Sequence, residues 1–285
     1  MFKYLIFLLL ITLSISSNAK TNWYCAHPEL CNLFQEIIDE NQISDLAIYN
    51  VVQLSGDPHE YEPKSVEIKN LIKVNNLIIG PKELNPWSTK INYQRIKNKN
   101  YKQIELTLST DDLKNYSYST NESISHFWLY PKIYCKFKNN LLTYLKNDNH
   151  PKLKISICDN SEIETKLKKA LANLHFSIIV THDAIVPLLK TLSPPSQNIV
   201  SLKGSGHHEE LNSAAIKNLY KALSDKRVIW IKEKNISIPT NISNKIRATD
   251  LVIELDTSST KRKSPFSVLV ELEAQLTSIA NKAYE

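Results

Sequence analysis

Short apolar runs rich in β-branched residues alternate with amphipathic runs along this chain, and this alternation restricts the fold most strongly. Strands that are joined by helices run parallel, because each helix returns the chain to the same end of the sheet. We predict an α/β protein with two similar lobes, each a four-stranded parallel sheet flanked by helices, joined by a helical linker. The predicted strands are residues 21–26, 47–54, 76–79, 103–108, 176–180, 198–202, 227–232 and 251–255, with a short extra strand at 153–158.

The helices between these strands are predicted from apolar residues at helical spacing, such as Ile163, Leu167 and Leu171. Segment 109–125 is polar and lacks periodicity, so we expect a loop there. The predicted helices are residues 28–39, 66–74, 131–145, 162–174, 184–191, 209–223, 243–248 and 265–283.

Residues 1–19 have the pattern of a secretory signal peptide. Lys3 precedes an apolar run at 4–15, and a small-x-small cleavage pattern ends at Ala19. The run is too short for a membrane span, and Cys25 lacks the small residues that precede a lipidated cysteine. We therefore expect a cleaved, exported, periplasmic protein without stable membrane insertion. Its expected parts are a first lobe (20–146), a linker region (147–174) and a second lobe (175–285).

Four cysteines in an exported chain favour disulfide bonds over metal ligation. Three pairings are possible. The pairs Cys25–Cys31 and Cys135–Cys158 enclose the shortest loops and are the preferred prediction. Buried free thiols are the alternative, as is metal binding by the segment from Cys25 to Cys31.

Charge and composition argue against a nucleic-acid-binding protein. The formal net charge is +6, but the basic residues are spread along the chain. The hydrophobic content of 42% is ordinary for a globular protein of this length. The partners expected from the sequence therefore do not include nucleic acid.

Four potential metal ligands occupy positions where a strand or loop opens toward solvent. His59, His182 and Asp256 follow predicted strands, and His126 follows the polar segment 109–125. In open α/β sheets, ligands bind at the carboxyl ends of the strands. Three imidazoles and one carboxylate would suit a tetrahedral zinc ion in the cleft between the two lobes.

The motifs around these residues resemble the solute-binding proteins of zinc and manganese ABC transporters, within the family's cluster A-I. The likeness covers nearly all of the chain after residue 19. It is carried by Asp57-Pro58-His59-Glu60-Tyr61-Glu62-Pro63, by His126, Trp128 and Pro131, by His182-Asp183-Ala184, and by Leu255-Asp256.

The resemblance implies a zinc-type member that captures the ion and delivers it to an inner-membrane ABC permease, as a monomer and not as an enzyme. Zinc is favoured over manganese because imidazole suits zinc and carboxylate-rich sites suit manganese. The sequence departs from the family at Ser123-Ile124-Ser125, which precede or stand in the place of the family's Asp-Pro before the histidine, and at Tyr130, where an aspartate is usual. It also has Pro151 where the family has one long helix, and segment 109–125 contains no histidine.

Two other functions remain open at this stage. A zinc hydrolase would need an open coordination position and a general base, and no His-Glu-x-x-His motif is present. A surface adhesin is a role of some relatives. Among other polar residues, Glu233 could be a ligand or a neighbour of one, and His207 and His208 could act as accessory metal ligands. No role is assigned to His27, His150 and His175.

Overall fold

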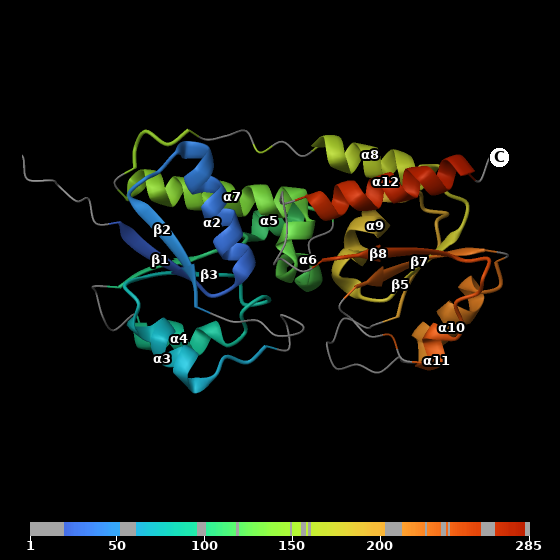
Figure 1. Ribbon diagram of the computed structural model, residues 1–285, viewed down its shortest axis with the longest axis horizontal. Coiled ribbons are helices and arrows are strands. Elements are labelled where there is room, and N and C mark those ends of the chain that lie inside the picture. The colour runs from blue at the N-terminus through green and yellow to red at the C-terminus, as the bar shows by residue number, and fades with distance from the viewer. Residues whose placement is uncertain are drawn as a thin grey trace, which may run out of the picture.

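The computed structural model describes residues 20–51, 61–95, 101–117, 120–148, 150–154, 158, 161–202, 213–225, 227–234, 238, 240–257 and 266–282. Two sheets lie side by side along the long axis, each with helices on both faces (Figure 1). Each sheet has four strands, and all neighbouring strands are parallel. The predicted fold class is therefore confirmed.

The first sheet has the strand order β2-β1-β3-β4. Helices α2 and α7 cover one face, and α3 and α4 cover the other (Figure 1). Strand β3 is buried along most of its length because its Leu and Ile side chains face both layers. The elements are β1 (Thr21–Cys25), α2 (Pro28–Asn41), β2 (Leu46–Asn50), α3 (Ser65–Lys73), β3 (Asn76–Ile79), α4 (Ser88–Arg95) and β4 (Lys102–Glu105).

The prediction of a loop at 109–125 is wrong, because this segment contains two short helices. Ser109 accepts a hydrogen bond from the N–H of Asp112, whose carboxylate accepts the N–H of Ser109 in return. This capping box starts a helix without any apolar periodicity. The elements here are α5 (Thr110–Asn115), α6 (Asn121–Ser125), the 3₁₀ turn η1 (Phe127–Leu129) and α7 (Pro131–Asn147).

The second sheet repeats the arrangement of the first, with the order β6-β5-β7-β8. The helix predicted at 243–248 is wrong in position, because the helix of this segment lies at Thr240–Ser243. Residues 247–250 form a turn before β8 instead, in which the Asp250 side chain accepts the N–H of Arg247. The elements are α8 (Ser161–Ala172), β5 (Ser177–Val180), η2 (Asp183–Ile185), α9 (Val186–Leu192), β6 (Ile199–Ser201), α10 (Ser213–Ala222), β7 (Val228–Glu233), α11 (Thr240–Ser243), β8 (Leu251–Leu255) and α12 (Ser267–Lys282).

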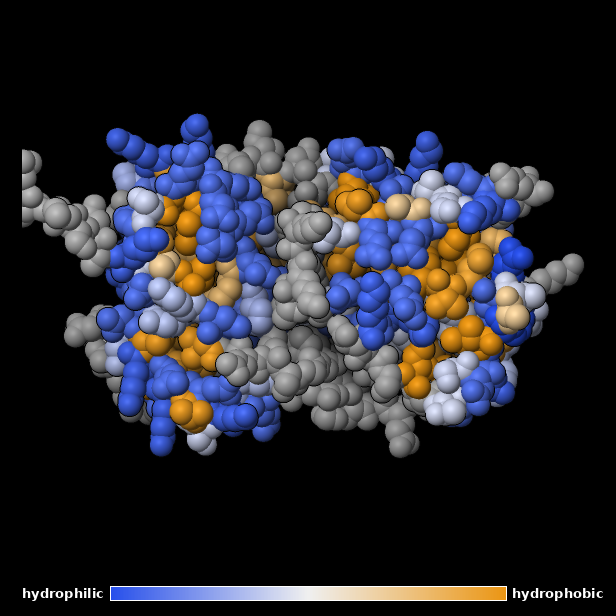
Figure 2. Space-filling model, viewed as in Figure 1, coloured by the Kyte–Doolittle hydropathy of each residue, from blue (hydrophilic) through white to orange (hydrophobic). Residues whose placement is uncertain are grey.

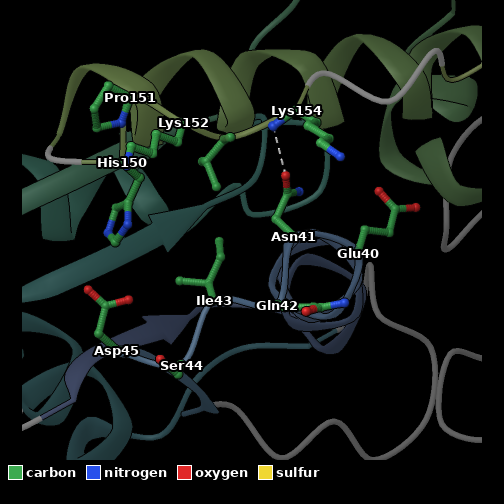
Figure 3. Close-up of a pocket in the computed structure, with 11 residues that line it drawn as sticks. Glu40, Asn41, Gln42, Ile43, Ser44, Asp45, His150, Pro151, Lys152 and Lys154 are labelled. Carbon is green, nitrogen blue, oxygen red and sulfur yellow. Dashed lines mark hydrogen bonds between the residues drawn. The ribbon is translucent and has the colours of Figure 1, made fainter.

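The chain between α7 and α8 is not one continuous helix. Helix α7 ends at Asn147, and residues 150–154 run past the C-terminal end of α2, where they border a hollow of about 580 Å³ (Figure 3). Asn41 Oδ1 accepts the N–H of Lys154 at 2.9 Å, and Leu153 is buried. Helix α8 then packs beside α12 over the second sheet (Figure 1). The break expected at Pro151 is therefore present.

Both predicted disulfides are present. Cys25 pairs with Cys31 across a Cα–Cα distance of 5.6 Å, and Cys135 pairs with Cys158 across 5.4 Å. These two bonds use all four cysteines of the sequence. The first joins the end of β1 to the first turn of α2, and the second joins α7 to the segment that precedes α8.

The largest hydrophobic cluster extends through both lobes. It contains Trp23 and Ile78 from the first sheet and Ile178 and Ile229 from the second, together with the inner faces of α7 and α12. Polar residues are spread over the visible face of both lobes and separate its apolar patches (Figure 2). Among the helices of the described residues, none combines the length and the apolar character needed to cross a membrane.

Candidate metal centre

His182 lies at the point of the second sheet where the strand order changes direction. The chain leaves β5 at Val180, and its neighbours β6 and β7 lie on opposite sides of it. Ligands bind at such switch points, outside the carboxyl ends of the strands. His182 has an extended backbone, caps η2 and is only 6% exposed. The predicted position of this histidine, at the end of a strand, is confirmed.

Glu233 ends β7, the strand beside β5, and its carboxylate contacts His182. Oε2 of Glu233 lies 2.9 Å from Nδ1 of His182. The backbone pairing of β5 with β7 brings the two residues close. Thr181, which precedes His182, donates its N–H to the carbonyl of Ile231 on β7. The Lys234 N–H also donates to the carbonyl of Leu255 on β8.

His126, from the segment between α6 and η1, meets His182 edge to face. The two ring centroids are 5.3 Å apart, with an interplanar angle of 80°. His126 follows α6, is 3% exposed and has Ser125 Oγ 3.4 Å from its Nδ1. Two of the four predicted ligands, which are far apart in the sequence, are therefore brought together.

Residues 127–130, which follow His126, are held against the second lobe by two buried hydrogen bonds. Trp128 Nε1 donates to the carbonyl of Thr257 at 3.2 Å. The Tyr130 hydroxyl donates to the carbonyl of Ala184 at 2.7 Å. Tyr130, at one of the positions that departs from the family pattern, therefore links the loop of His126 to the turn that follows His182.

Asp256 follows β8, as predicted, and precedes the residue whose carbonyl accepts the Trp128 indole N–H. His59 lies outside the described residues, as do His207 and His208. Within the part of the chain that the structure describes, no three His, Cys, Asp or Glu side chains are grouped closely enough to hold a metal ion. The described residues contribute the pair His126 and His182, with Glu233 beside it.

His27 is a residue of this region to which the sequence assigned no role. It follows β1 by two residues and caps α2, accepting the N–H of Glu29 at Nδ1. Its buried ring stacks on Trp128, with centroids 5.3 Å apart. His182 stands two residues after β5, the corresponding strand of the second sheet. In each sheet, therefore, a histidine lies two residues after the strand at the switch point. This repeat is visible in the sequence and could have indicated that His27 lies near His126 and Trp128.

Comparisons with known proteins establish the fold. No protein-family model matches the sequence, and no curated protein matches it by sequence. The crystal structure of ZnuA gives a TM-score of 0.61 at 18% identity, with 92% of this chain and 98% of that chain covered.

Two further solved structures align over the same extent. The periplasmic zinc-binding protein TroA from Treponema pallidum gives a TM-score of 0.67 at 12% identity, covering 92% of this chain and 99% of that chain. A mutant of the laminin-binding adhesin Lmb from Streptococcus agalactiae gives 0.66 at 14% identity, covering 93% and 99%. This chain therefore has the two-lobed α/β fold of ZnuA, TroA and Lmb, as the motifs led us to expect.

Proposed function

We propose that this protein captures a zinc ion outside the inner membrane and delivers it to an ABC permease. The observation that carries the proposal is the meeting of the His126 and His182 rings at the carboxyl ends of the second sheet, with Glu233 beside them. Two buried imidazoles from distant segments form a nitrogen-rich site, which zinc favours. TroA, which shares the fold, is a periplasmic zinc-binding protein.

The proposed ligands are His59, His126, His182 and Asp256. A shell of three neutral imidazoles and one carboxylate is complete at four ligands, as in zinc sites that bind the ion rather than activate water. The protein would then act as a carrier and not as an enzyme. Because imidazoles bind metal only when deprotonated, zinc release should become easier as the pH falls.

The remaining parts of the proposal concern location and assembly. Residues 1–19 would be removed as a signal peptide, leaving an exported monomer of two lobes, 20–146 and 175–285, with the linker region 147–174. The two disulfides support an exported protein, because such bonds persist in oxidising compartments.

A metal titration of the mature protein tests the proposal. Protein purified without chelator is analysed for metal, and zinc and manganese are then titrated in competition with a chelator. We expect one zinc per chain and a preference for zinc over manganese of at least about a hundredfold, since manganese is the weakest binder in the first-row order. Comparable affinities would contradict the zinc assignment, and a failure to bind either metal would contradict the whole proposal.

Histidine variants identify the ligands. His126→Ala and His182→Ala should each weaken zinc binding by at least about tenfold, because each removes one ligand. His150→Ala is the matched control, because His150 lines the hollow at the end of α2, and the lining of that hollow includes neither His126 nor His182. Equal affinity in all three variants would show that the paired histidines are not ligands.

A further inference from the structure

Tyr130 is tied to the first lobe by its backbone and to the second lobe by its side chain. It is the N-cap of α7, which packs against α2, and its carbonyl accepts the N–H of Tyr134 in the first turn of that helix. Its hydroxyl donates to the carbonyl of Ala184 at 2.7 Å, in the turn η2 that follows His182. Tyr130 is 0% and Ala184 is 1% exposed, so a water molecule cannot readily replace this hydrogen bond.

A second hydrogen bond leaves the same segment of the chain. Trp128 Nε1 donates to the carbonyl of Thr257 at 3.2 Å, and both residues are buried. Thr257 directly follows Asp256. The Tyr130 and Trp128 bonds therefore connect the segment that follows His126 to the segments that follow two other proposed ligands.

Neither hydrogen bond uses an imidazole or a carboxylate of the proposed metal site. The two bonds can therefore hold these segments in place before a metal ion binds. The contact between the His126 and His182 rings, with centroids 5.3 Å apart, lies between them. Because a broken buried hydrogen bond leaves a polar group unpaired, loss of one donor should let the segments separate part of the time.

We propose that Tyr130 and Trp128 are positioning residues that hold the segments of His126 and His182 together before zinc binds. The inference rests on the proposed function for its metal, but the ring contact is a property of the protein alone. A ligand binds more weakly when the arrangement that accepts it is only partly populated, in proportion to that population. The two hydrogen bonds would keep this population high.

The experiment compares Tyr130→Phe, which removes the hydroxyl and keeps the ring, with Tyr144→Phe. Tyr144 is a suitable control because it lies on α7, and its ring packs edge to face against Trp23 of the first sheet. The first measurement is the nuclear Overhauser effect between the ring protons of His126 and His182 in metal-free protein. The second is zinc binding by stopped flow, which gives the association and dissociation rates separately.

In the wild type and in Tyr144→Phe, we expect the contact between the two histidine rings and equal zinc kinetics. In Tyr130→Phe, the contact should weaken, and zinc association should slow by about 2–10-fold, the effect of one neutral hydrogen bond. The dissociation rate should stay the same, because the metal ligands are unchanged. Trp128→Phe removes the donor of the second bond and should change in the same direction, and it carries the test if Tyr130→Phe does not fold.

An unchanged ring contact in Tyr130→Phe would overturn the inference, as would a zinc association rate equal to that of Tyr144→Phe. If zinc binding weakens only through faster dissociation, the hydroxyl acts on the bound state, and the role before binding is wrong. If the wild type binds no zinc, the proposed function fails, and loss of the ring contact in Tyr130→Phe would still support the holding role of the hydroxyl.

Discussion

At the scale of single residues, Asp250 shows how a buried charge can organise a turn. Its carboxylate is fully buried and accepts hydrogen bonds from Arg247, from the Trp230 indole and from the N–H of Val228. Burial by itself would raise the pKa of this carboxyl. The hydrogen bonds outweigh burial and hold the pKa below its usual range.

This lowered pKa predicts a stability that depends on pH. The folded protein binds the Asp250 proton less tightly than the unfolded chain, so the contribution is present above the unfolded pKa of about 3.9. It is lost as the pH falls through the lower folded-state value. Asp250→Asn should lower the unfolding free energy at neutral pH by about 2 kcal/mol, the scale of hydrogen bonds to a charged group.

Urea unfolding of Asp250→Asn between neutral and acidic pH checks this prediction. The difference from the wild type should shrink once the pH is below about 3.9. Asp45→Asn, which changes an exposed carboxylate, is the control. A difference that stays constant over this range would mean that ionisation of Asp250 does not stabilise the fold.

At the scale of elements, a charged cluster around one buried lysine joins α2 to α7. Lys138 on α7 is 4% exposed and donates to Glu36 and Glu40 on α2. Tyr134, one turn earlier on α7, donates its hydroxyl to Glu36. Burial and the Glu36 carboxylate raise the pKa of Tyr134, so its hydroxyl keeps the proton that it donates.

Removal of the central cation should therefore destabilise the contact between these two helices. We expect Lys138→Met to cost about 2–3 kcal/mol, less than for a fully buried pair, because both carboxylates remain partly exposed. Lys132→Met is the control on the same helix, since the Lys132 side chain is about half exposed and its contact with Glu164 is long, at 3.5 Å. Equal unfolding free energies for the two variants, by urea titration, would contradict this account.

At the scale of the whole molecule, the lobes are joined by more than the linker. The main hydrophobic cluster extends through both, and the Trp128 and Tyr130 hydrogen bonds cross between them. The Cys135–Cys158 bond ties α7 to the segment before α8. This disulfide connects the segments on either side of the interruption near Pro151 covalently, where a continuous helix is absent.

This bond should contribute measurably to stability. A disulfide across a sequence separation of 23 residues restricts the unfolded chain, for an expected gain of about 3 kcal/mol. The double variant Cys135→Ala/Cys158→Ala should lose that amount in urea unfolding. Thiol titration of the denatured, unreduced wild-type protein should find no free thiol. Four free thiols, or an unchanged unfolding free energy, would show that the bond does not form.

Local pattern was sufficient to predict most of the fold from the sequence. Strand and helix periodicity reflects which side chains are buried, and it placed all eight strands of the two sheets to within a few residues. It failed at 109–125 and at 243–248, because side-chain capping by Ser109 and Asp250 decides those segments and produces no periodic signal. The disulfide pairing also followed from local spacing.

The sequence by itself determined that His182 and Asp256 follow strands, because local burial sets the strand ends. Only the tertiary structure decided which of the predicted ligands meet. The His126 and His182 rings touch because the loop after α6 is fastened to the second lobe by Trp128 and Tyr130. Glu233 reaches His182 because β5 and β7 are neighbours, and strand order depends on the packing of the whole sheet, which no single segment encodes.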